Sequence, residues 1–355
     1  ERISLNGQPI SDDELVKAAQ KVAPVVDYLD QVLPEGGPTE FEIDTAIMFT
    51  WFAQKKPDVV ILEVGIGGLY DSTNVIVPAV SGIVTVGYDH MHVLGDTLAE
   101  IACQKAGIIK PNVPVVIGRL PQTARQTIIA DAQEKQAPLY ENGRQFTAKK
   151  INCHQLKNEI VYDGLMLHRQ RFQLGLAGEY QVDNAAVALT MAQLYLKRLG
   201  VPIDVQAFQN GLANTRWPGR LEIVNDSPLV VLDGAHNLPG MQALTTTLQN
   251  DFKEMEIYVL VAILADKQYQ LMLGEIASLP NVHLMLTNFA GPGPKRPSAD
   301  LEKAAKDIKT HWPIETAPSW QEGLLRLSRE VSADDAILIT GSLYFISEVR
   351  RFFSD

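Results

Sequence analysis

Cysteine and long apolar runs are both scarce in this sequence. The two cysteines, Cys103 and Cys153, lie far apart and form no CxxC pair. This spacing argues against a disulfide scaffold and favours a reducing compartment, the cytoplasm. The longest uninterrupted apolar run, Ile257 to Ala265, is far shorter than the roughly 20 residues that span a bilayer. The sequence therefore shows neither a disulfide framework nor a membrane anchor.

An excess of positive charge is also lacking. Lysine and arginine together number 31 against 42 aspartates and glutamates, and the formal net charge is −11. Because nucleic-acid phosphates are neutralised by clustered Lys and Arg, we do not expect nucleic acid as the main partner. An acidic ligand would instead have to meet local cations or a bound metal.

Length and composition are those of an ordinary globular protein. With 46% hydrophobic and 21% charged residues, the chain has the composition of a soluble protein. Its 355 residues exceed one ordinary core, so about two domains are expected. The chain begins with Glu1-Arg2-Ile3, without methionine or a signal-peptide pattern, which predicts that the start of the natural protein is missing.

One stretch, residues 58–74, organises the first half of the chain. Its first part, residues 58–64, is an apolar, β-branched run between Pro57 and a glycine cluster, and it predicts a strand buried in a parallel sheet. Glu63 interrupts this run, and an unpaired buried carboxylate would be costly. We therefore expect Glu63 at the strand's carboxyl end, facing a cation or strong donor, or else satisfied by neighbouring backbone N–H groups.

Gly65, Gly67 and Gly68 raise a second interpretation of this stretch, a dinucleotide-binding turn. That motif needs a helix to begin at once, so that its N-terminus meets the pyrophosphate. Residues 71–78 are instead rich in β-branched residues and end in proline, which is a poor helix start. Asp89 supports this interpretation, because it follows at about the distance of a ribose-binding acid, roughly 20 residues on.

Two histidines and a second carboxylate follow the next predicted strand, residues 82–86. Asp89, His90 and His92 lie just beyond its end, at the edge where Glu63 is also expected. Alone, His90 would fit a hydrogen-bonded loop histidine equally well. Paired with Glu63, it is better explained as a ligand of a hard divalent cation that keeps positions open for phosphate oxygens.

Two further polar residues lie on predicted helices. Lys105 occupies the last turn of a helix that ends at Gly107, where a lysine complements the helix dipole. Residues 139–176 alternate in short segments and predict an antiparallel appendage. A long helix over residues 178–199 then carries Asn184, and a lone amide on a helix is usually just solvated.

The remaining third of the chain predicts a second α/β domain. Pro218 and Gly219 mark a hinge, and a βα pattern restarts directly beyond it. Its first strand runs into Asp233 and His236, and its last strand runs into Ser342, at a helix N-terminus that could hold an anion. The buried strands are expected at residues 229–232, 257–262, 282–286 and 336–340.

Together these segments resemble the folylpolyglutamate synthase and dihydrofolate synthase family, members of the Mur-ligase group. The resemblance covers essentially the whole chain, and its motifs occur in the expected order. The matching residues are Glu1–Ile3, Glu63–Gly68, Asp71–Asn74, Asp89–His90, Lys105–Lys110, Trp217–Glu222, Asp233–Asn237 and Ile339–Ser342.

The resemblance implies a fold and an activity. The implied fold is α/β, with a P-loop-type ATPase domain of mostly parallel sheet over residues 1–219, incomplete at its N-terminus, and a smaller Rossmann-like C-terminal domain over residues 220–355. The implied enzyme is a cytoplasmic, monomeric ligase that uses ATP and Mg²⁺ to add L-glutamate to a folate, and also to dihydropteroate, through an acyl phosphate. The sequence does not separate dihydrofolate synthase activity from polyglutamylation.

The resemblance also implies a role for each candidate residue. The implied roles are catalytic for Lys105, as an N-carboxylated lysine, and for His236, near the phosphates and the incoming glutamate; ATP-binding for Asn184, Arg220 and Asp233; Mg²⁺-binding for Glu63 and His90; and substrate-binding for Ser342. The chemistry is consistent with these roles, because forming an acyl phosphate between two anions needs cations, which Mg²⁺ and Arg220 would supply.

One motif of the family is absent. The family binds ATP with a G-x-x-x-x-G-K-[ST] loop, and no Gly-Lys dipeptide occurs in these 355 residues. Without that loop the β- and γ-phosphates lose their cradle and its lysine. We therefore expect an enzyme that lacks its N-terminal segment. A non-catalytic nucleotide-binding module and a sibling ligase for cell-wall precursors are the alternatives.

Overall fold

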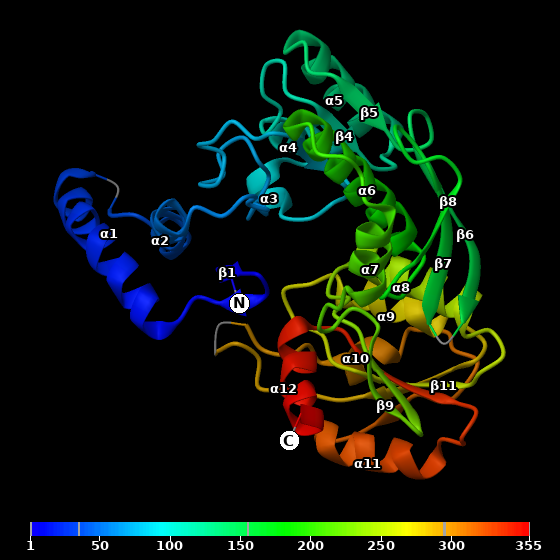
Figure 1. Ribbon diagram of the computed structural model, residues 1–355. Helices are drawn as coiled ribbons and strands as arrows, with labels where there is room; N and C mark the ends of the chain where they lie inside the picture. The colour runs from blue at the N-terminus through cyan, green and yellow to red at the C-terminus, as the bar shows by residue number, and fades with distance from the viewer. Residues whose placement is uncertain (1, 35, 155, 294–295, 355) are drawn as a thin grey trace. The chain divides into compact units, whose positions relative to one another are not determined.

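The computed structural model describes residues 2–34, 36–154, 156–293 and 296–354. The chain divides into two compact units, which are described separately (Figure 1). Unit 1 comprises residues 1–79, 90–113 and 122–137, and unit 2 comprises residues 80–89, 114–121 and 138–355. Among the described residues, no helix is both long and apolar enough to cross a membrane.

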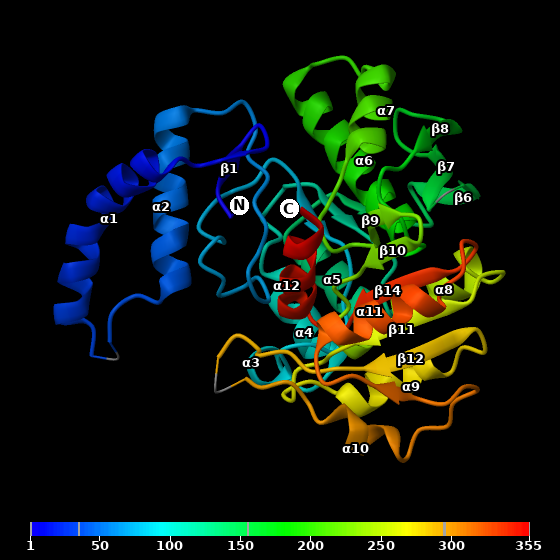
Figure 2. The same cartoon turned by 90° about the horizontal axis from the view of Figure 1, so that it is seen from below.

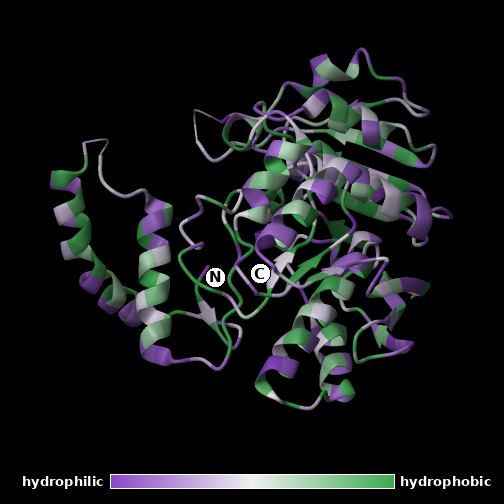
Figure 3. Ribbon diagram, turned by 90° about the horizontal axis from the view of Figure 1, so that it is seen from above, coloured by the Kyte–Doolittle hydropathy of each residue, from purple (hydrophilic) through white to green (hydrophobic). Residues whose placement is uncertain are grey.

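Unit 1 is mainly helical. A hairpin of β1 (Ser4–Leu5) and β2 (Gln8–Pro9) leads into α1 (Asp12–Val32) and α2 (Glu40–Lys55). As predicted, the Ser11 side chain caps α1, and Thr39 with Glu42 forms a capping box at α2. The two amphipathic helices, at the left of Figure 3, bury a small core between them. Its buried members are Ile3, Ala18, Val22, Ile47 and Trp51.

The rest of unit 1 consists of a long irregular segment and three helices. These helices are α3 (Met91–Leu94), α4 (Leu98–Ala106) and α5 (Gln122–Glu134), and α4 packs against α5. Thr97 and Glu100 form the predicted capping box at the start of α4. Ile101 and Ala102 of α4 are fully buried, which fixes the face on which this helix packs.

The predicted buried strand over residues 58–64 is wrong. These residues have no regular secondary structure, and Ile61 is 94% exposed. A buried parallel strand needs hydrogen-bonded neighbours along both edges. Among the described strands, none pairs with residues 58–64, so their apolar side chains lie at the surface of unit 1.

The first part of unit 2 contains two small sheets. The parallel sheet has the order β3-β4-β5, with β3 (Ser81–Ile83), β4 (Val115–Ile117) and β5 (Leu139–Glu141). The predicted antiparallel appendage is confirmed as β6 (Thr147–His154), β7 (Lys157–Asp163) and β8 (Gln170–Gln173). The helix α6 (Tyr180–Leu199) packs on both sheets, and α7 (Val205–Asn214) lies against β8.

A six-stranded sheet forms the C-terminal part of unit 2. Its order is β13-β12-β11-β14-β10-β9, and every neighbouring pair is parallel except β9 with β10. The four predicted strands are confirmed, and β9 and β13 are the two outermost strands of the sheet. Their bounds are β9 (Glu222–Asp226), β10 (Leu229–Leu232), β11 (Ile257–Val261), β12 (Val282–Leu286), β13 (Glu315–Thr316) and β14 (Ala336–Thr340).

Helices cover both faces of this sheet, as Figures 1 and 2 show. Alternate residues of β11 point to opposite cores: Val259 and Val261 pack towards one set of helices and Leu260 towards the other. The first set is α8 (Leu238–Asp251), α9 (Tyr269–Ala277) and α10 (Leu301–Ala305), and the second is α11 (Trp320–Glu330) and α12 (Leu343–Ser354). This three-layer architecture places the loops at the two ends of the strands, which we call the amino edge and the carboxyl edge of the sheet.

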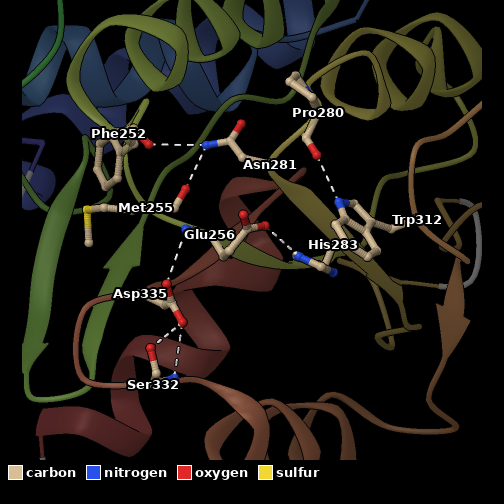
Figure 4. Close-up of polar contacts among 9 residues, drawn as sticks. All are labelled: Phe252, Met255, Glu256, Pro280, Asn281, His283, Trp312, Ser332 and Asp335. Carbon is tan, nitrogen blue, oxygen red and sulfur yellow. Dashed lines mark hydrogen bonds and ion pairs between the residues drawn. The ribbon is translucent and has the colours of Figure 1, made fainter.

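Polar contacts close the amino edge of the sheet (Figure 4). His283 pairs with Glu256, with 2.7 Å between Nε2 and Oε2, and its ring stacks on Trp312 with the centroids 4.5 Å apart. Asp335 accepts a hydrogen bond from the backbone N–H of Glu256 at 3.2 Å. Asn281 donates to the carbonyls of two residues of the turn before β11, Phe252 and Met255. These side chains are half-buried or exposed, and each has a partner within the protein.

Candidate active site

The carboxyl edge of the six-stranded sheet collects the polar residues predicted for the second domain. Asp233 directly follows β10, and Ser342 comes shortly after β14, its parallel neighbour. Ser342 is 1% exposed, and its carbonyl accepts a hydrogen bond from Ile346 as α12 begins. Gly234 lies against this helix, because a Cβ there would approach Leu343 Cδ2 to 2.4 Å. The end of β10 and the start of α12 are therefore in contact.

Asp233 is a buried carboxylate that organises the surrounding backbone. It is 3% exposed and accepts hydrogen bonds from the N–H groups of Leu221 (3.0 Å) and Ala235 (2.9 Å). Burial raises the pKa of Asp233 to about 6, while these two N–H groups and the charge of Arg220 act in the opposite direction. The side chain is therefore mostly ionised at pH 7 and ties the predicted hinge to the end of β10.

The hinge is anchored at both of its ends. Gly219 has a φ of +70° and accepts a hydrogen bond from the N–H of Gly234 at 2.7 Å. Its own N–H donates to Glu222 at 2.8 Å. Glu222 in turn receives hydrogen bonds from Arg350 of α12, at 2.9 Å and 3.0 Å to its two oxygens. These contacts hold Arg220 at the carboxyl edge.

The charge of Arg220 reaches three other groups of this edge. Its positive charge acts to lower the pKa values of Asp233, Tyr180 and His236, although burial raises those of Asp233 and Tyr180 overall. Tyr180 begins α6, and its pKa is raised by burial and by the charge of Asp233. Asn184 lies one turn further along the same face of α6. The structure thus brings Arg220, Asp233 and His236 together, with Asn184 on the adjoining helix.

His236 is held as a neutral imidazole with a defined tautomer. Its Nδ1 lies 2.8 Å from the carbonyl oxygen of Gly234, and because a carbonyl only accepts, Nδ1 carries the proton and Nε2 is the acceptor. Burial lowers the pKa of His236, and the charges of Lys267 and Arg220 lower it further, against the effects of Gly234 and Asp89. At pH 7 the side chain can therefore accept a proton.

Asp89 is fastened to the same edge. The Asn237 side chain donates to Asp89 Oδ2 at 2.9 Å, and its own Oδ1 caps α8 by accepting from Gly240 N–H at 2.8 Å. This contact joins the end of the segment after β3 to the residue next to His236. A role of Asp89 as a ribose-binding acid has no support in this arrangement.

The glycine loop of unit 1 lies on the last turn of α4. A Cβ on Gly68 would come within 2.9 Å of the carbonyl oxygen of Gln104 and 3.1 Å of that of Lys105. Asn74 donates to the carbonyls of Leu69 and Gly107, both at 3.1 Å. No helix begins in this described segment, so the dinucleotide-binding interpretation is wrong. The loop that follows Glu63 is instead built onto the helix that carries Lys105.

Glu63 and His90 are both exposed in unit 1. His90 has a left-handed φ of +49°, and its ring centroid lies 6.3 Å from that of His92. In the part of the chain that the structure describes, no group of three or more His, Cys, Asp or Glu side chains is arranged to hold a metal. The roles of Glu63 and His90 as metal ligands, and that of Lys105, stay predictions.

Family models match most of the chain. The Mur ligase middle domain matches residues 14–192, and the Mur ligase glutamate ligase domain matches residues 219–343. A folylpolyglutamate synthase of Lacticaseibacillus casei is 38% identical over 352 residues, which is 99% of this chain and 80% of that protein. The chain belongs to the folylpolyglutamate synthase family of Mur ligases.

Other members of the folylpolyglutamate synthase family agree in sequence and fold. A dihydrofolate synthase/folylpolyglutamate synthase of Bacillus subtilis is 36% identical, covering 99% of this chain and 80% of that protein. The Mycobacterium tuberculosis folylpolyglutamate synthase complexed with ADP and AMPPCP has a TM-score of 0.86 at 29% identity, covering 99% of this chain and 81% of that one. The predictions of family, α/β fold and ligase class are confirmed.

Two residues of this carboxyl edge were not predicted from the sequence. Lys267 lies in the loop after β11, and its charge acts on His236. Tyr180 was part of a helix with no marked chemistry, yet it is electrostatically coupled to Asp233. A lysine after a strand end is a usable signal in hindsight, because ligand sites lie at the carboxyl ends of parallel strands.

Proposed function

We propose that this protein is an ATP-dependent amide ligase that joins L-glutamate to a folate carboxylate through an acyl phosphate. The observation that carries the proposal is the carboxyl edge of the C-terminal sheet, where a neutral His236 lies within the field of Arg220 and Lys267. Cations offset the charge that accumulates when phosphate meets a carboxylate. A neutral imidazole can take a proton from the attacking amine.

Names of relatives support the proposed substrates. Solved structures of related folylpolyglutamate synthases include an AMPPCP complex and an AMPPCP–folate complex, each 34% identical to this chain. Some relatives are named for dihydrofolate synthase as well. We therefore propose ATP and a folate as ligands of this chain, with dihydropteroate as a second acceptor of glutamate. The site residues in this proposal are Asn184, Arg220, Asp233, His236 and Ser342.

We propose Mg²⁺ as the metal, held by Glu63 and His90. An exposed carboxylate and an exposed imidazole in one unit are two suitable donors, and Mg²⁺ sites often take only one or two protein ligands with the rest from phosphate and water. Bound there, the ion would offset phosphate charge.

We also propose that Lys105 is N-carboxylated. Its ammonium would repel a nearby divalent cation, whereas a carbamate formed with CO₂ removes the positive charge and provides oxygens that hard cations prefer. In the natural enzyme, Lys105→Ala should lose most activity, and acetate should restore part of it. Near-normal activity of the variant would contradict the carbamate.

The decisive experiment is an ADP-release assay on the natural protein with glutamate, offering a reduced folate and dihydropteroate in separate reactions. Release that depends on glutamate and on one of the two acceptors supports the ligase, and the active acceptor identifies the substrate. ATP binding without ADP release under any condition would favour the alternative of a nucleotide-binding module.

We further propose a domain boundary near residue 219 and a cytoplasmic monomer.

A separate prediction concerns the phosphate loop. No Gly-Lys dipeptide occurs in the 355 residues, so the β- and γ-phosphates have no P-loop in this chain. We expect these 355 residues alone to bind ATP weakly and to release ADP far more slowly than the L. casei relative. ADP release at the rate of that relative would contradict this expectation.

A further inference from the structure

The loop that carries Lys267 is held by a neighbouring segment. The N–H of Ala265 donates to the carbonyl of Pro297 at 3.0 Å, and the N–H of Ala299 donates to the carbonyl of Ile263 at 2.7 Å. Leu264 and Ser298 form an antiparallel bridge between these two bonds. The loop after β11 is therefore paired with the segment after β12, in the manner of a short sheet.

Arg296 stands at the end of this pairing and contacts two further elements. Its Nε and Nη2 each lie 2.8 Å from Asp266 Oδ2, and Asp266 directly precedes Lys267. Its guanidinium carbon lies 5.9 Å from the ring centroid of Tyr344, within reach of a cation–π contact. Tyr344 belongs to the first turn of α12, close to Ser342. One side chain thus links the loops after β11 and β12 to the helix after β14.

We propose that Arg296 is a positioning residue, which holds Asp266 against the first turn of α12 and so fixes where Lys267 presents its ammonium at the carboxyl edge. This inference rests on the proposed function. The group received there is anionic, either a carboxylate of the incoming glutamate or a phosphoryl oxygen of the nucleotide. Arg296 itself touches neither substrate.

Stability does not explain this contact well. The Arg296 and Asp266 side chains are 40% and 45% exposed, and exposed ion pairs contribute little to the free energy of unfolding. Positioning is a larger effect, because displacing a group by about 1 Å from its productive geometry can cost on the order of 100-fold in rate. The planar fork of arginine suits this role, since it can donate to Asp266 while one face rests on an aromatic ring.

The test compares Arg296→Met and Arg296→Lys with a matched control in the natural enzyme. The control is Arg326→Met, which breaks a pair with Glu322 on α11 that is equally exposed, at 43% and 42%. We expect Arg296→Met to lower kcat/KM by about 10- to 100-fold, with Arg296→Lys intermediate and Arg326→Met near wild type. The melting temperatures of all three should stay close to that of the wild type. If Arg296→Met does not fold, Arg296→Lys decides.

Two binding measurements identify the anion. A raised KM for glutamate with unchanged AMPPCP affinity assigns the carboxylate, and weaker AMPPCP binding with unchanged KM for glutamate assigns the phosphoryl group. Either result supports the proposal. Unchanged kinetics in Arg296→Met, with the wild type active, would overturn it, and an inactive wild type would instead overturn the proposed function.

A double variant tests whether Arg296 acts through Lys267. If it does, Arg296→Met adds little further loss to Lys267→Met, because the two changes remove the same interaction. Multiplicative losses in the double variant would show that Arg296 acts by another route, and would contradict the inference.

Discussion

The two edges of the C-terminal sheet are both polar, but they differ in burial and in the direction of their pKa shifts. At the carboxyl edge Asp233 is 3% exposed, and its pKa is raised to about 6 by burial. At the amino edge Asp335 is half-buried, and hydrogen bonds led by that of Ser332 lower its pKa. At the carboxyl edge, burial opposes the ionisation of Asp233. At the amino edge, hydrogen bonds favour the ionised form of Asp335.

The comparison shows that polar contacts alone do not mark a functional site. His283 is hydrogen-bonded to Glu256 (Figure 4) and stacks on the rings of Tyr258 and Trp312, whereas the hydrogen bond described for His236 is the one to the carbonyl of Gly234. His283, however, is enclosed by a carboxylate and two rings, whereas His236 keeps an acceptor nitrogen near two cations. Groups whose charge states are shifted by burial and specific neighbours are the better functional candidates.

The largest expected difference between the edges concerns the two histidines. His236→Ala should lower kcat by about 100- to 10,000-fold, the usual contribution of a general acid or base. His283→Ala should leave kcat within about twofold and lower stability by about 1 kcal/mol, because it loses a partly exposed hydrogen bond and ring stacking. Steady-state kinetics and urea unfolding measure both. Similar losses of kcat in the two variants would remove the distinction.

Arg220 provides the next largest effect. Arg220→Ala in the natural enzyme should weaken nucleotide binding by about 2–5 kcal/mol, the range for losing a desolvated charge contact. Calorimetric titration with AMPPCP gives the affinity. Unchanged affinity and turnover would show that Arg220 is only a hinge residue of the surface.

Asp233 should give the carboxyl edge a distinctive pH dependence. Its folded pKa of about 6 lies above the ordinary 3.8, so the folded state binds more protons than the unfolded state between these values. This contribution to stability is complete below pH 3.8 and is lost as pH rises through 6, by about 3 kcal/mol. Urea unfolding at several pH values should show the loss in the wild type and not in Asp233→Asn. Parallel curves for the two proteins would contradict it.

Asp335 sharpens the contrast because its pKa is shifted in the opposite direction from that of Asp233. Its pKa is lowered in the folded state, so its contribution is present above pH 3.8 and is lost as pH falls through the folded pKa. Asp335→Asn should therefore flatten the acid side of the stability curve, where Asp233→Asn does not. Equal behaviour of the two variants would mean that the edges are electrostatically alike.

The smallest effect is expected for Asn281 at the amino edge. Its side chain donates to the carbonyls of Phe252 (3.1 Å) and Met255 (2.7 Å). Asn281→Ala should cost about 1 kcal/mol of stability and leave ADP release unchanged. A loss of activity larger than the loss of stability explains would show that this edge also serves the reaction.

Much of the second domain could be predicted from the sequence, because its signals are local. Buried apolar runs gave the four inner strands, and the residues after them, Asp233 and Ser342, necessarily fall at the carboxyl edge. The edge strands β9 and β13 were missed, since β9 is only half-buried and β13 is very short. Pairing with a neighbour, rather than pattern, makes them strands.

The first unit was less predictable because strand formation depends on pairing with a neighbour as well as on local composition. Residues 58–64 have the composition of a buried strand, but no described strand pairs with them, so composition alone misleads. Tyr180 was missed because nothing in its local sequence indicates its electrostatic coupling to Asp233, whereas Lys267 carried only the weak signal of a lysine after a strand end. Their significance comes from electrostatic interactions between residues far apart in the chain.

The most direct test of the central claim follows the histidine resonances of the natural enzyme by NMR while AMPPCP, a folate and glutamate are added. His236→Gln and His283→Gln assign the two signals. We expect the His236 signal and its pH titration to change on binding, while the His283 signal stays as it is in the free enzyme. A ligand response at His283, with none at His236, would place the reaction at the amino edge of the sheet and contradict the proposed site at the carboxyl edge.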